Sequence, residues 1–371
     1  MLLSADLHVH LGRDASGHPV KIPASARLTL EGVVARAREV GLDAVGVVEG
    51  HNPCLRRQLQ EWVQQGRAVA FREGFWLPEP GLVLLLGMEM ELALPPASGR
   101  RAHYVWFPEE WEDLPRRLDA VLRRLKNPCL STPLLPLDPA QVAAWGGVFF
   151  PAHAFTPFRG ALAQYPHLYP PGVRWLELGL SANTEMANAW PELSSTVFLT
   201  HSDAHSLSTV GREFTLLDAP AASPQGVLQA LAQGAVLANV GLPPALGKYH
   251  AATCRAGHRV ENPQASLCPQ CGAEVVRGVA PLLAERAAGG TLPWRPPYRE
   301  RVMLAAVPGL GASALAKVLA SWREIAAREV VAGEWFDTAV RQGVGERIRR
   351  LRAGEGHYEL GGGGRYGRIR I

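Results

Sequence analysis

Histidine and carboxylate side chains recur at the ends of short apolar runs in the first 205 residues. They are His8, His10, Glu49, His51, Glu89, Glu91, His153, Asp203 and His205. Imidazole and carboxylate groups are suitable ligands for zinc, manganese or iron, and carboxylates that bridge are more typical of two or three metals than of one. A histidine that stands alone is more often a hydrogen-bonded core residue, which is our interpretation of His18, His167 and His357. The clustered residues therefore predict a metal centre.

Two pairs of these residues have a spacing that sets the direction of their side chains. His8 and His10 are separated by one residue, and so are Asp203 and His205. Because side chains alternate across an extended chain, both members of a pair point to one face only if the backbone is extended. We therefore expect extended backbone at both pairs.

Short apolar runs alternate with helical patterns from residue 1 to about 240, which is typical of strand and helix units around a parallel sheet or barrel. The predicted strands are residues 44–48, 82–86, 147–150, 175–180 and 197–199. Amphipathic stretches at 30–40, which ends at Gly41, and at 114–126 predict helices that cover the sheet. The candidate ligands follow the strands, and α/β folds carry active sites at the carboxyl ends of strands, so we expect these ligands to converge.

Several motifs resemble those of a known superfamily. Asp6-Leu-His-Val-His10, Gly87-Met-Glu89, Ala-His103-Tyr, Pro-Ala-His153 and Ser202-Asp-Ala-His205 are similar to the successive motifs of the polymerase-and-histidinol-phosphatase (PHP) superfamily. This resemblance implies an α/β fold, a distorted (β/α)7 barrel, with a cluster of up to three metals that hydrolyses phosphoesters.

Further phrases resemble one family within that superfamily, the endonuclease Q family. They are Pro151-Ala-His-Ala-Phe-Thr-Pro157, Glu177-Leu-Gly-Leu-Ser-Ala182, Ser202-Asp-Ala-His-Ser206, Gly211-Arg-Glu-Phe214 and Gly247-Lys-Tyr-His250 before a cysteine cluster. The resemblance covers nearly the whole chain. It implies cleavage of DNA on the 5′ side of deaminated bases (uracil, hypoxanthine, xanthine) and of abasic sites.

Transferred to this chain, the family's motifs imply nine metal ligands. They are His8, His10, Glu49, His51, Glu89, His103, His153, Asp203 and His205. The chain departs from the family at Glu49, where Asp is usual with another spacing to the next histidine, and in the loop after His10, which differs from the serine-rich version that the family would lead us to expect. Glu91 is an alternative to Glu89 as the bridging carboxylate, and a surface location for Glu49 would leave fewer metals.

The expected cofactors are two or three divalent metals: zinc, manganese or magnesium. Paired metals about 3.5–4 Å apart neutralise a phosphodiester, make hydroxide at neutral pH and align the attacking and leaving oxygens, so no nucleophilic side chain is required. Among the ligands, Asp203 is our candidate for holding metal and water together. His205 and His153 are the candidates that orient or protonate the leaving oxygen.

Three of the five cysteines crowd into eighteen residues. With one histidine they form a candidate structural zinc site of Cys254, His258, Cys268 and Cys271, because a closed four-ligand tetrahedron is usual for structural zinc. His250 competes with His258 as the fourth ligand, and free thiols in a loop are the alternative to a metal site. The odd cysteine count and the absence of an export signal argue against a disulfide framework.

The last part of the chain is basic and contains two glycine turns. Residues 286–371 hold fifteen Lys and Arg against eight Asp and Glu. Val307-Pro-Gly-Leu-Gly311 before residues 312–319 resembles the hairpin of a helix-hairpin-helix, and Gly343-Val-Gly345 is a candidate second copy. The residues predicted to contact DNA backbone are Gly309, Gly311, Lys317, Arg347, Arg349 and Arg350. Gly-containing turns between packed helices on a solvated basic surface are the alternative.

Length and composition fit a globular protein of 371 residues with 47% apolar and 19% charged residues. We expect a PHP metallo-phosphoesterase domain at 1–245, a zinc-binding segment at 246–290 and a basic helical DNA-binding module at 291–371. No apolar run is long enough to span a bilayer, and the first residues contain no signal-peptide core, so the cytoplasm is the expected compartment.

Together these features predict a metal-dependent endonuclease that acts on damaged DNA and has no membrane partner; a replication or repair protein partner, if one exists, is not identified. One alternative is a small-molecule phosphatase on the same barrel. This alternative explains the metal ligands but gives no function to the cysteine segment or the basic tail. The other is a non-catalytic DNA-binding member of the family. Metal content distinguishes the second alternative from an enzyme, and salt-dependent DNA binding distinguishes the first.

Overall fold

The computed structural model describes residues 1–95, 98–262, 264–289, 292–301, 346–347, 350 and 355–370. The chain divides into two compact units, Met1–Gly241 with Val279–Arg299, and Leu242–Gly278 with Glu300–Ile371. Residues 279–299 thus belong to the first unit, and the expected division into three domains at 245 and 290 stays a prediction. Within the described residues, no helix is both long and apolar enough to span a membrane.

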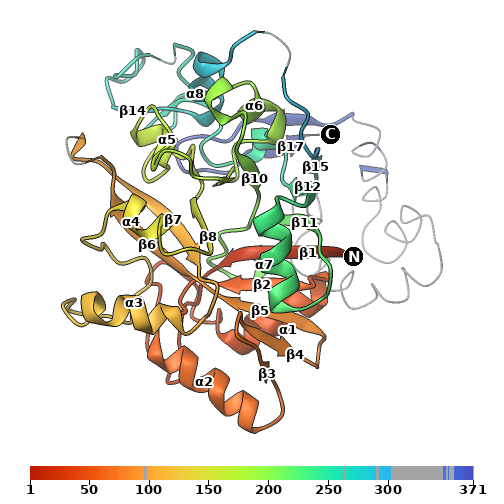
Figure 1. Ribbon diagram of the computed structural model, residues 1–371. Coiled ribbons are helices and arrows are strands. Elements are labelled where there is room, and N and C mark those ends of the chain that lie inside the picture. The colour runs from red at the N-terminus through yellow and green to blue at the C-terminus, as the bar shows by residue number, and fades with distance from the viewer. Residues whose placement is uncertain are drawn as a thin grey trace. The chain divides into compact units, whose positions relative to one another are not determined.

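The first unit contains most of the helices and strands, which Figure 1 labels. Its elements are β1 (Leu2–Val9), α1 (Leu30–Val40), β2 (Ala44–Val47), α2 (Pro53–Gln64), β3 (Val69–Ala70), β4 (Phe75–Leu77), β5 (Leu82–Leu86), β6 (Met88–Ala93), β7 (Arg101–Phe107), α3 (Asp113–Leu122), α4 (Pro139–Ala143), β8 (Val148–Pro151), α5 (Ala161–Gln164), β9 (Trp175–Glu177), α6 (Thr184–Asn188), β10 (Val197–Leu199), β11 (Phe214–Asp218), α7 (Pro224–Gln233), β12 (Val236–Gly241), α8 (Val279–Arg286) and β15 (Tyr298–Glu300). The second unit contains β13 (Thr253–Cys254), β14 (Val275–Val276), β16 (His357–Glu359) and β17 (Arg368–Arg370).

The strands of the first unit hydrogen-bond in three sheets. An eight-stranded sheet has the order β15-β12-β11-β1-β2-β5-β4-β3, an antiparallel sheet has the order β6-β7-β8, and β9 pairs with β10. Strands β1, β2 and β5 run parallel to one another, and β9 runs parallel to β10. The predicted mixed α/β class is therefore confirmed, whereas closure of these sheets into a (β/α)7 barrel stays a prediction.

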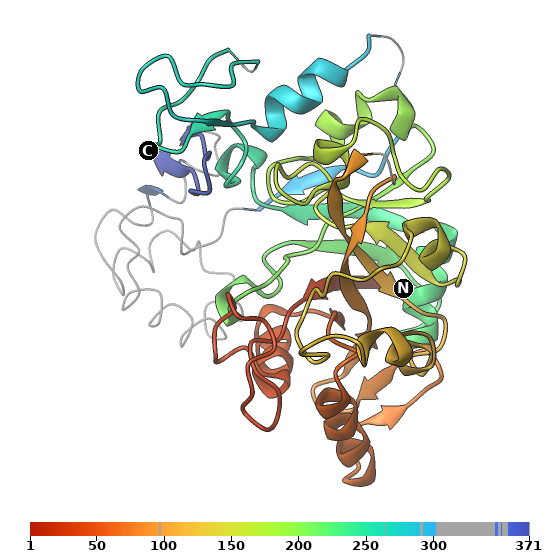
Figure 2. The ribbon, with the colours of Figure 1, turned by 90° about the vertical axis from the view of Figure 1, so that its left-hand side faces the viewer.

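Strand β5 shows why the sequence contains continuous apolar runs. Leu84 and Leu86 pack in one buried cluster with side chains of α1 and α2, while Val83 and Leu85 pack in a second cluster with Val227 of α7. A strand that is buried on both faces needs apolar side chains at every position. Figure 2 shows α7 in green and the two red-to-brown helices α1 and α2 on different sides of these strands.

The helix and strand predictions agree closely with the structure where local signals are strong. Helix α1 begins after Thr29, whose side chain accepts a hydrogen bond from the Gly32 amide, and ends at Gly41 with a left-handed φ of 74°. The helix predicted to reach residue 126 instead ends at Leu122, where the next amides form tighter turns.

Phe107 provides a test of the core between the sheets. Its side chain is 1% exposed, and a Cβ atom at Gly46 would lie 2.5 Å from its ring, so Gly46 of β2 must remain a glycine for this ring to fit. Phe107→Ala is expected to lower the free energy of unfolding by about 3–5 kcal/mol. Phe71→Ala, at a 41% exposed position, is the matched control and should change it by less than about 1 kcal/mol. Denaturant unfolding followed by circular dichroism measures both, and equal effects would contradict the packing.

Candidate metal centre

The end of β1 and the segment after β10 lie side by side. The first carries His8 and His10, and the second carries Asp203 and His205. Val9 and Ala204 form a parallel bridge, in which the His10 amide donates to the Ala204 carbonyl and the Ala204 amide donates to the His8 carbonyl. Because neighbours of a paired residue point to the same face, this bridge directs His8, His10 and Asp203 toward one place. The extended backbone expected for the His8 pair is confirmed by β1, which ends at Val9. The same expectation is wrong for the second pair, because the backbone of Asp203 is left-handed with a φ of 46°.

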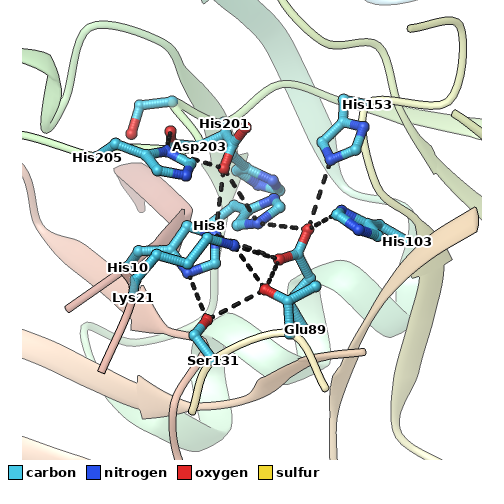
Figure 3. Close-up of polar contacts among 12 residues, drawn as sticks. His8, His10, Lys21, Glu89, His103, Ser131, His153, His201, Asp203 and His205 are labelled. Atoms are coloured by element: carbon cyan, nitrogen blue, oxygen red, sulfur yellow. Dashed lines mark hydrogen bonds and ion pairs between the residues drawn. The ribbon is translucent and has the colours of Figure 1, made fainter. Parts of the chain in front are cut away.

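Two groups of three ligands form at this place (Figure 3). The first is His8, His10 and Asp203, and the second is Glu89, His103 and His153; within each group the ligand atoms lie within 4.8 Å of one another. In the first group, Asp203 Oδ1 lies 3.6 Å from His8 Nε2 and 3.2 Å from His10 Nε2. In the second, Glu89 Oε1 lies 2.9 Å from His103 Nδ1 and 3.4 Å from His153 Nε2.

Glu89 lies between the two groups. Its Oε1 atom is 3.5 Å from His8 Nε2 and its Oε2 atom is 3.3 Å from His10 Nε2, so this carboxylate contacts both sets of ligands. Glu91 instead forms ion pairs with Arg159 and Arg101, at 3.0 and 3.5 Å. Glu89 rather than Glu91 is thus the carboxylate that contacts both ligand groups.

The donor atoms in these groups have the properties that metal ligands need. His8 Nε2 is buried, and the carboxylate oxygens of Glu89 and Asp203 near it are 3.5 and 3.6 Å away, too far for a good hydrogen bond, which is costly for a polar atom without another partner. Each group also combines imidazole with carboxylate, which suits zinc or manganese. The residues present therefore fit divalent metal ions.

Two buried carboxylates orient the histidines of the first group. His10 Nδ1 donates to Glu49 Oε1 at 2.6 Å, and His8 Nδ1 donates to Glu177 Oε2 at 2.9 Å, which leaves both Nε2 atoms facing the group. Burial raises the pKa of Glu177, but His8 and His201 outweigh this effect and hold it at about 2. Both carboxylates are therefore charged acceptors that fix the ring orientations.

Six of the nine expected ligands lie in the two groups, and three do not. His205 lies next to the first group, with its Nδ1 atom 2.8 Å from the Asp203 carbonyl. Glu49 contacts the outer side of His10, and its other oxygen accepts from the Leu11 amide. His51 Nε2 donates to the Leu130 carbonyl, and burial lowers the pKa of His51 to about 4. Glu49 thus lies where it can orient the His10 ring, and His51 is directed at the Leu130 carbonyl rather than at either ligand group.

Lys21 is a site residue that the sequence interpretation missed. Its ammonium lies 3.2 Å from Glu89 Oε2, 3.3 Å from His10 Nε2 and 2.6 Å from Thr132 Oγ1, and Thr132 also donates to Glu89. Burial lowers the pKa of Lys21, but Glu89 and other carboxylates raise it more, so the ammonium stays charged. Both residues lie in loops without a motif, and the sequence contains no signal that links them to the metal groups.

Three residues of the site have strained backbones. Thr132, His153 and Asp203 have φ values of 54°, 33° and 46°, and they are the non-glycine residues with positive φ in the described part of the chain. Such conformations cost on the order of 1–3 kcal/mol each and persist where the surroundings hold them. All three side chains contact the two ligand groups or Glu89, so the strain is concentrated at this site.

The second unit contains the predicted cysteine site. Cys254, His258, Cys268 and Cys271 form one group whose ligand atoms lie within 4.8 Å of one another. The sulfurs of Cys254 and Cys271 are 3.7 Å apart, as are Cys268 Sγ and His258 Nδ1. Zinc–sulfur bonds of about 2.3 Å in a tetrahedron separate sulfurs by about 3.8 Å, so the group fits zinc. It includes His258, the preferred of the two histidines in the sequence.

The residues predicted to bind DNA in the basic tail are mostly outside the described residues. Gly309, Gly311, Lys317 and Arg349 fall in segments that the structure does not describe. Of the two that are described, Arg350 forms an ion pair with Glu355 at 2.8 Å. The helix-hairpin-helix interpretation stays a prediction.

The chain is similar over its full length to an uncharacterized bacterial protein. YqxK of Bacillus subtilis is 33% identical over 99% of this chain and 98% of that protein. MJ0043 of Methanocaldococcus jannaschii, also uncharacterized, is 31% identical over 58% of this chain and 31% of its own length. A family model described as PHP-associated matches residues 185–236.

Two crystal structures share the fold of the whole chain. One is endonuclease Q in complex with a 27-mer duplex substrate with an abasic lesion at the active site, with a TM-score of 0.84 and 25% identity over 100% of this chain and 97% of that one. The other is the lesion-specific endonuclease PfuEndoQ of Pyrococcus furiosus, with a TM-score of 0.81 and 26% identity over 100% of this chain and 96% of that one. Both resemble this chain across its full length rather than in one domain.

Glu177→Gln tests whether this carboxylate fixes a metal-binding histidine. The amide keeps the size of the side chain but removes the charge that accepts the His8 Nδ1 proton, so we expect metal affinity to fall about 10–100-fold. Competition with a chelating dye measures the affinity, and the melting temperature reports the fold. Glu61→Gln on the exposed face of α2 is the control. Unchanged metal affinity in Glu177→Gln would contradict the orienting role.

His258→Ala and His250→Ala test the composition of the cysteine site. Because binding a structural metal is coupled to folding, His258→Ala should lose most of one zinc ion per chain and the local order around the cysteines. His250→Ala should keep the zinc. Elemental analysis of the purified variants measures the content, and the opposite pattern would make His250 the ligand.

Proposed function

Because the chain belongs to the endonuclease Q family of the PHP superfamily, we propose that it is a metal-dependent DNA repair endonuclease. Its proposed reaction is hydrolysis of the phosphodiester on the 5′ side of deaminated bases (uracil, hypoxanthine or xanthine) and of abasic sites. The observation that carries this proposal is the pair of ligand groups that Glu89 joins, in a chain that resembles lesion-specific nucleases over its whole length.

The proposed metal ligands are the six residues of the two groups, with His205 beside them. When bound there, divalent metals neutralise the phosphodiester and lower the pKa of water, which is the chemistry that hydrolysis needs. Glu89 joins the two groups, while Glu49 and Glu177 hold His10 and His8 in the orientation that ligation requires. A structural zinc at the cysteine group completes the proposed cofactors.

Asp203, His205 and His153 are the proposed catalytic residues. The side chains of Asp203 and His205 are 33% and 35% exposed, so a substrate approaching from solvent reaches them before the buried ligands. Burial lowers the pKa of His205 to about 4, and its imidazole is therefore neutral near pH 7. We assign to the neutral His205 the orientation of the leaving oxygen, to His153 its orientation or protonation, and to Asp203 the positioning of water.

Contacts to the DNA backbone are proposed at two places. Arg101 and Arg159 are about half exposed and are held by Glu91, which also lies 3.8 Å from His103 Nε2 of the second group. Their positive charge beside the metal ligands suits phosphates that flank the reacting one. The basic tail, with its predicted glycine turns, is the second proposed contact.

A small-molecule phosphatase would use the same ligand groups, so the substrate must be tested directly. Labelled duplexes that carry uracil, hypoxanthine, an abasic site or no lesion are incubated with manganese, magnesium or zinc. We expect a nick on the 5′ side of each lesion by the wild-type protein. Survival of every duplex, together with hydrolysis of p-nitrophenyl phosphate, would replace the nuclease with a phosphatase.

Asp203→Asn tests the assignment of the site in the same assay. Loss of this charged ligand should slow cleavage by about 100-fold or more without a change in melting temperature. Asp119→Asn, an exposed carboxylate on α3, is the matched control and should cleave like the wild type. Equal rates for Asp203→Asn and the wild type would exclude Asp203 from the reaction.

A further inference from the structure

We infer that Lys21 supplies a fixed positive charge where a third metal would otherwise be needed, so that the catalytic centre binds two divalent ions and uses the Lys21 ammonium as its third cation. The part of this inference that concerns catalysis rests on the proposed function. The part that concerns metal content does not, because it depends only on the arrangement of the ligands.

The Lys21 ammonium is placed among the groups that a cation would bind. Its Nζ atom lies 3.2 Å from Glu89 Oε2 and 2.6 Å from Thr132 Oγ1, and Figure 3 shows it directed at the carboxylate that joins the two ligand groups. Only 12% of the Lys21 side chain is exposed. A buried charge is costly unless it is paired, and Glu89 provides the pair.

The backbone holds Lys21 in this position. The Lys21 amide donates to the Leu11 carbonyl directly after His10, and the Ala24 amide donates to the Lys21 carbonyl. The Ser131 amide donates to the Val20 carbonyl and so ties this loop to the loop of Thr132. Thr132 has the strained φ of 54° that brings its hydroxyl between Lys21 and Glu89. These hydrogen bonds fix the position of Lys21, in contrast to that of a lysine on a flexible surface loop.

A third divalent ion lacks ligands in the described residues of the first unit. The two groups there use six ligands, and His205 is the remaining expected ligand close to them. Glu49 is engaged by His10, Leu11 and Ser131, and His51 by the Leu130 carbonyl. One imidazole is too few for zinc, which protein sites hold with three or four side chains.

The position of Lys21 also gives its charge a role in the proposed reaction. An ammonium has three N–H donors, and Glu89 and Thr132 accept two of them. The third faces His10 Nε2 at 3.3 Å, an atom that cannot accept once it binds a metal. That donor is then available to an anionic oxygen of the phosphodiester, which lysine binds as a point charge.

The metal content of the full-length protein tests the first part. The protein is saturated with zinc or manganese, freed of unbound metal and measured by elemental analysis, alongside a Cys268→Ser variant that lacks the cysteine site. We expect three ions per chain in the wild type and two in the variant. Four in the wild type and three in the variant would overturn the inference.

Lys21→Ala tests the second part under single-turnover conditions on a uracil duplex. We expect cleavage to slow by about 100-fold with two ions still in the catalytic centre, and ethylammonium to restore part of the rate. Lys126→Ala, an exposed lysine after α3, is the matched control and should cleave normally. An unchanged rate in Lys21→Ala, or a slow rate that ethylammonium does not raise, would overturn the role of the charge.

The two tests separate this inference from the proposed function. If the wild type cleaves no lesion-containing duplex with any metal, the proposed function fails. A count of two ions in the catalytic centre would still support the replacement of a third metal by Lys21.

Discussion

The ionised carboxylate of Glu89 is buried in the first unit, and the surrounding structure compensates its charge. Burial opposes ionisation, so a carboxylate at this depth needs cationic or hydrogen-bonding partners on several sides. His103, Lys21 and His10 outweigh burial and keep the pKa of Glu89 well below its usual value. These partners come from β7, from the residue directly after β1 and from the loop that follows it. The sheets must therefore bring distant segments of the chain to β6 before this charge can be buried.

The parallel bridge between Val9 and Ala204 has a similar role for the first ligand group. It joins the first strand to a segment almost two hundred residues later. It thereby sets how His8 and His10 lie relative to Asp203 and His205. A register shift by one residue would turn His8 and His10 to the other face, because strand side chains alternate. The buried carboxylates Glu49 and Glu177 then fix which ring nitrogen of each histidine faces the group.

Local patterns predicted the elements that depend on local interactions. The helix at 30–40 and the strands at 82–86 and 197–199 agree with the structure in both bounds, because helix caps and apolar runs depend on residues that are adjacent in sequence. The place of Lys21 beside Glu89, and that of Glu49 behind His10, depend instead on contacts between segments far apart in sequence. A single sequence contains no periodic signal for such contacts. The same is true of the pairing of strands into three sheets, which side-chain patterns do not specify.

The candidate ligand groups of the two units differ in the number of ligands that each contains. Four ligands close the cysteine group, and a closed tetrahedron has no position for a substrate. Each group in the first unit has three ligands, and Asp203, whose strained backbone directs it to the first group, is partly exposed. A substrate that approaches from solvent would meet the exposed sides of Asp203 and His205.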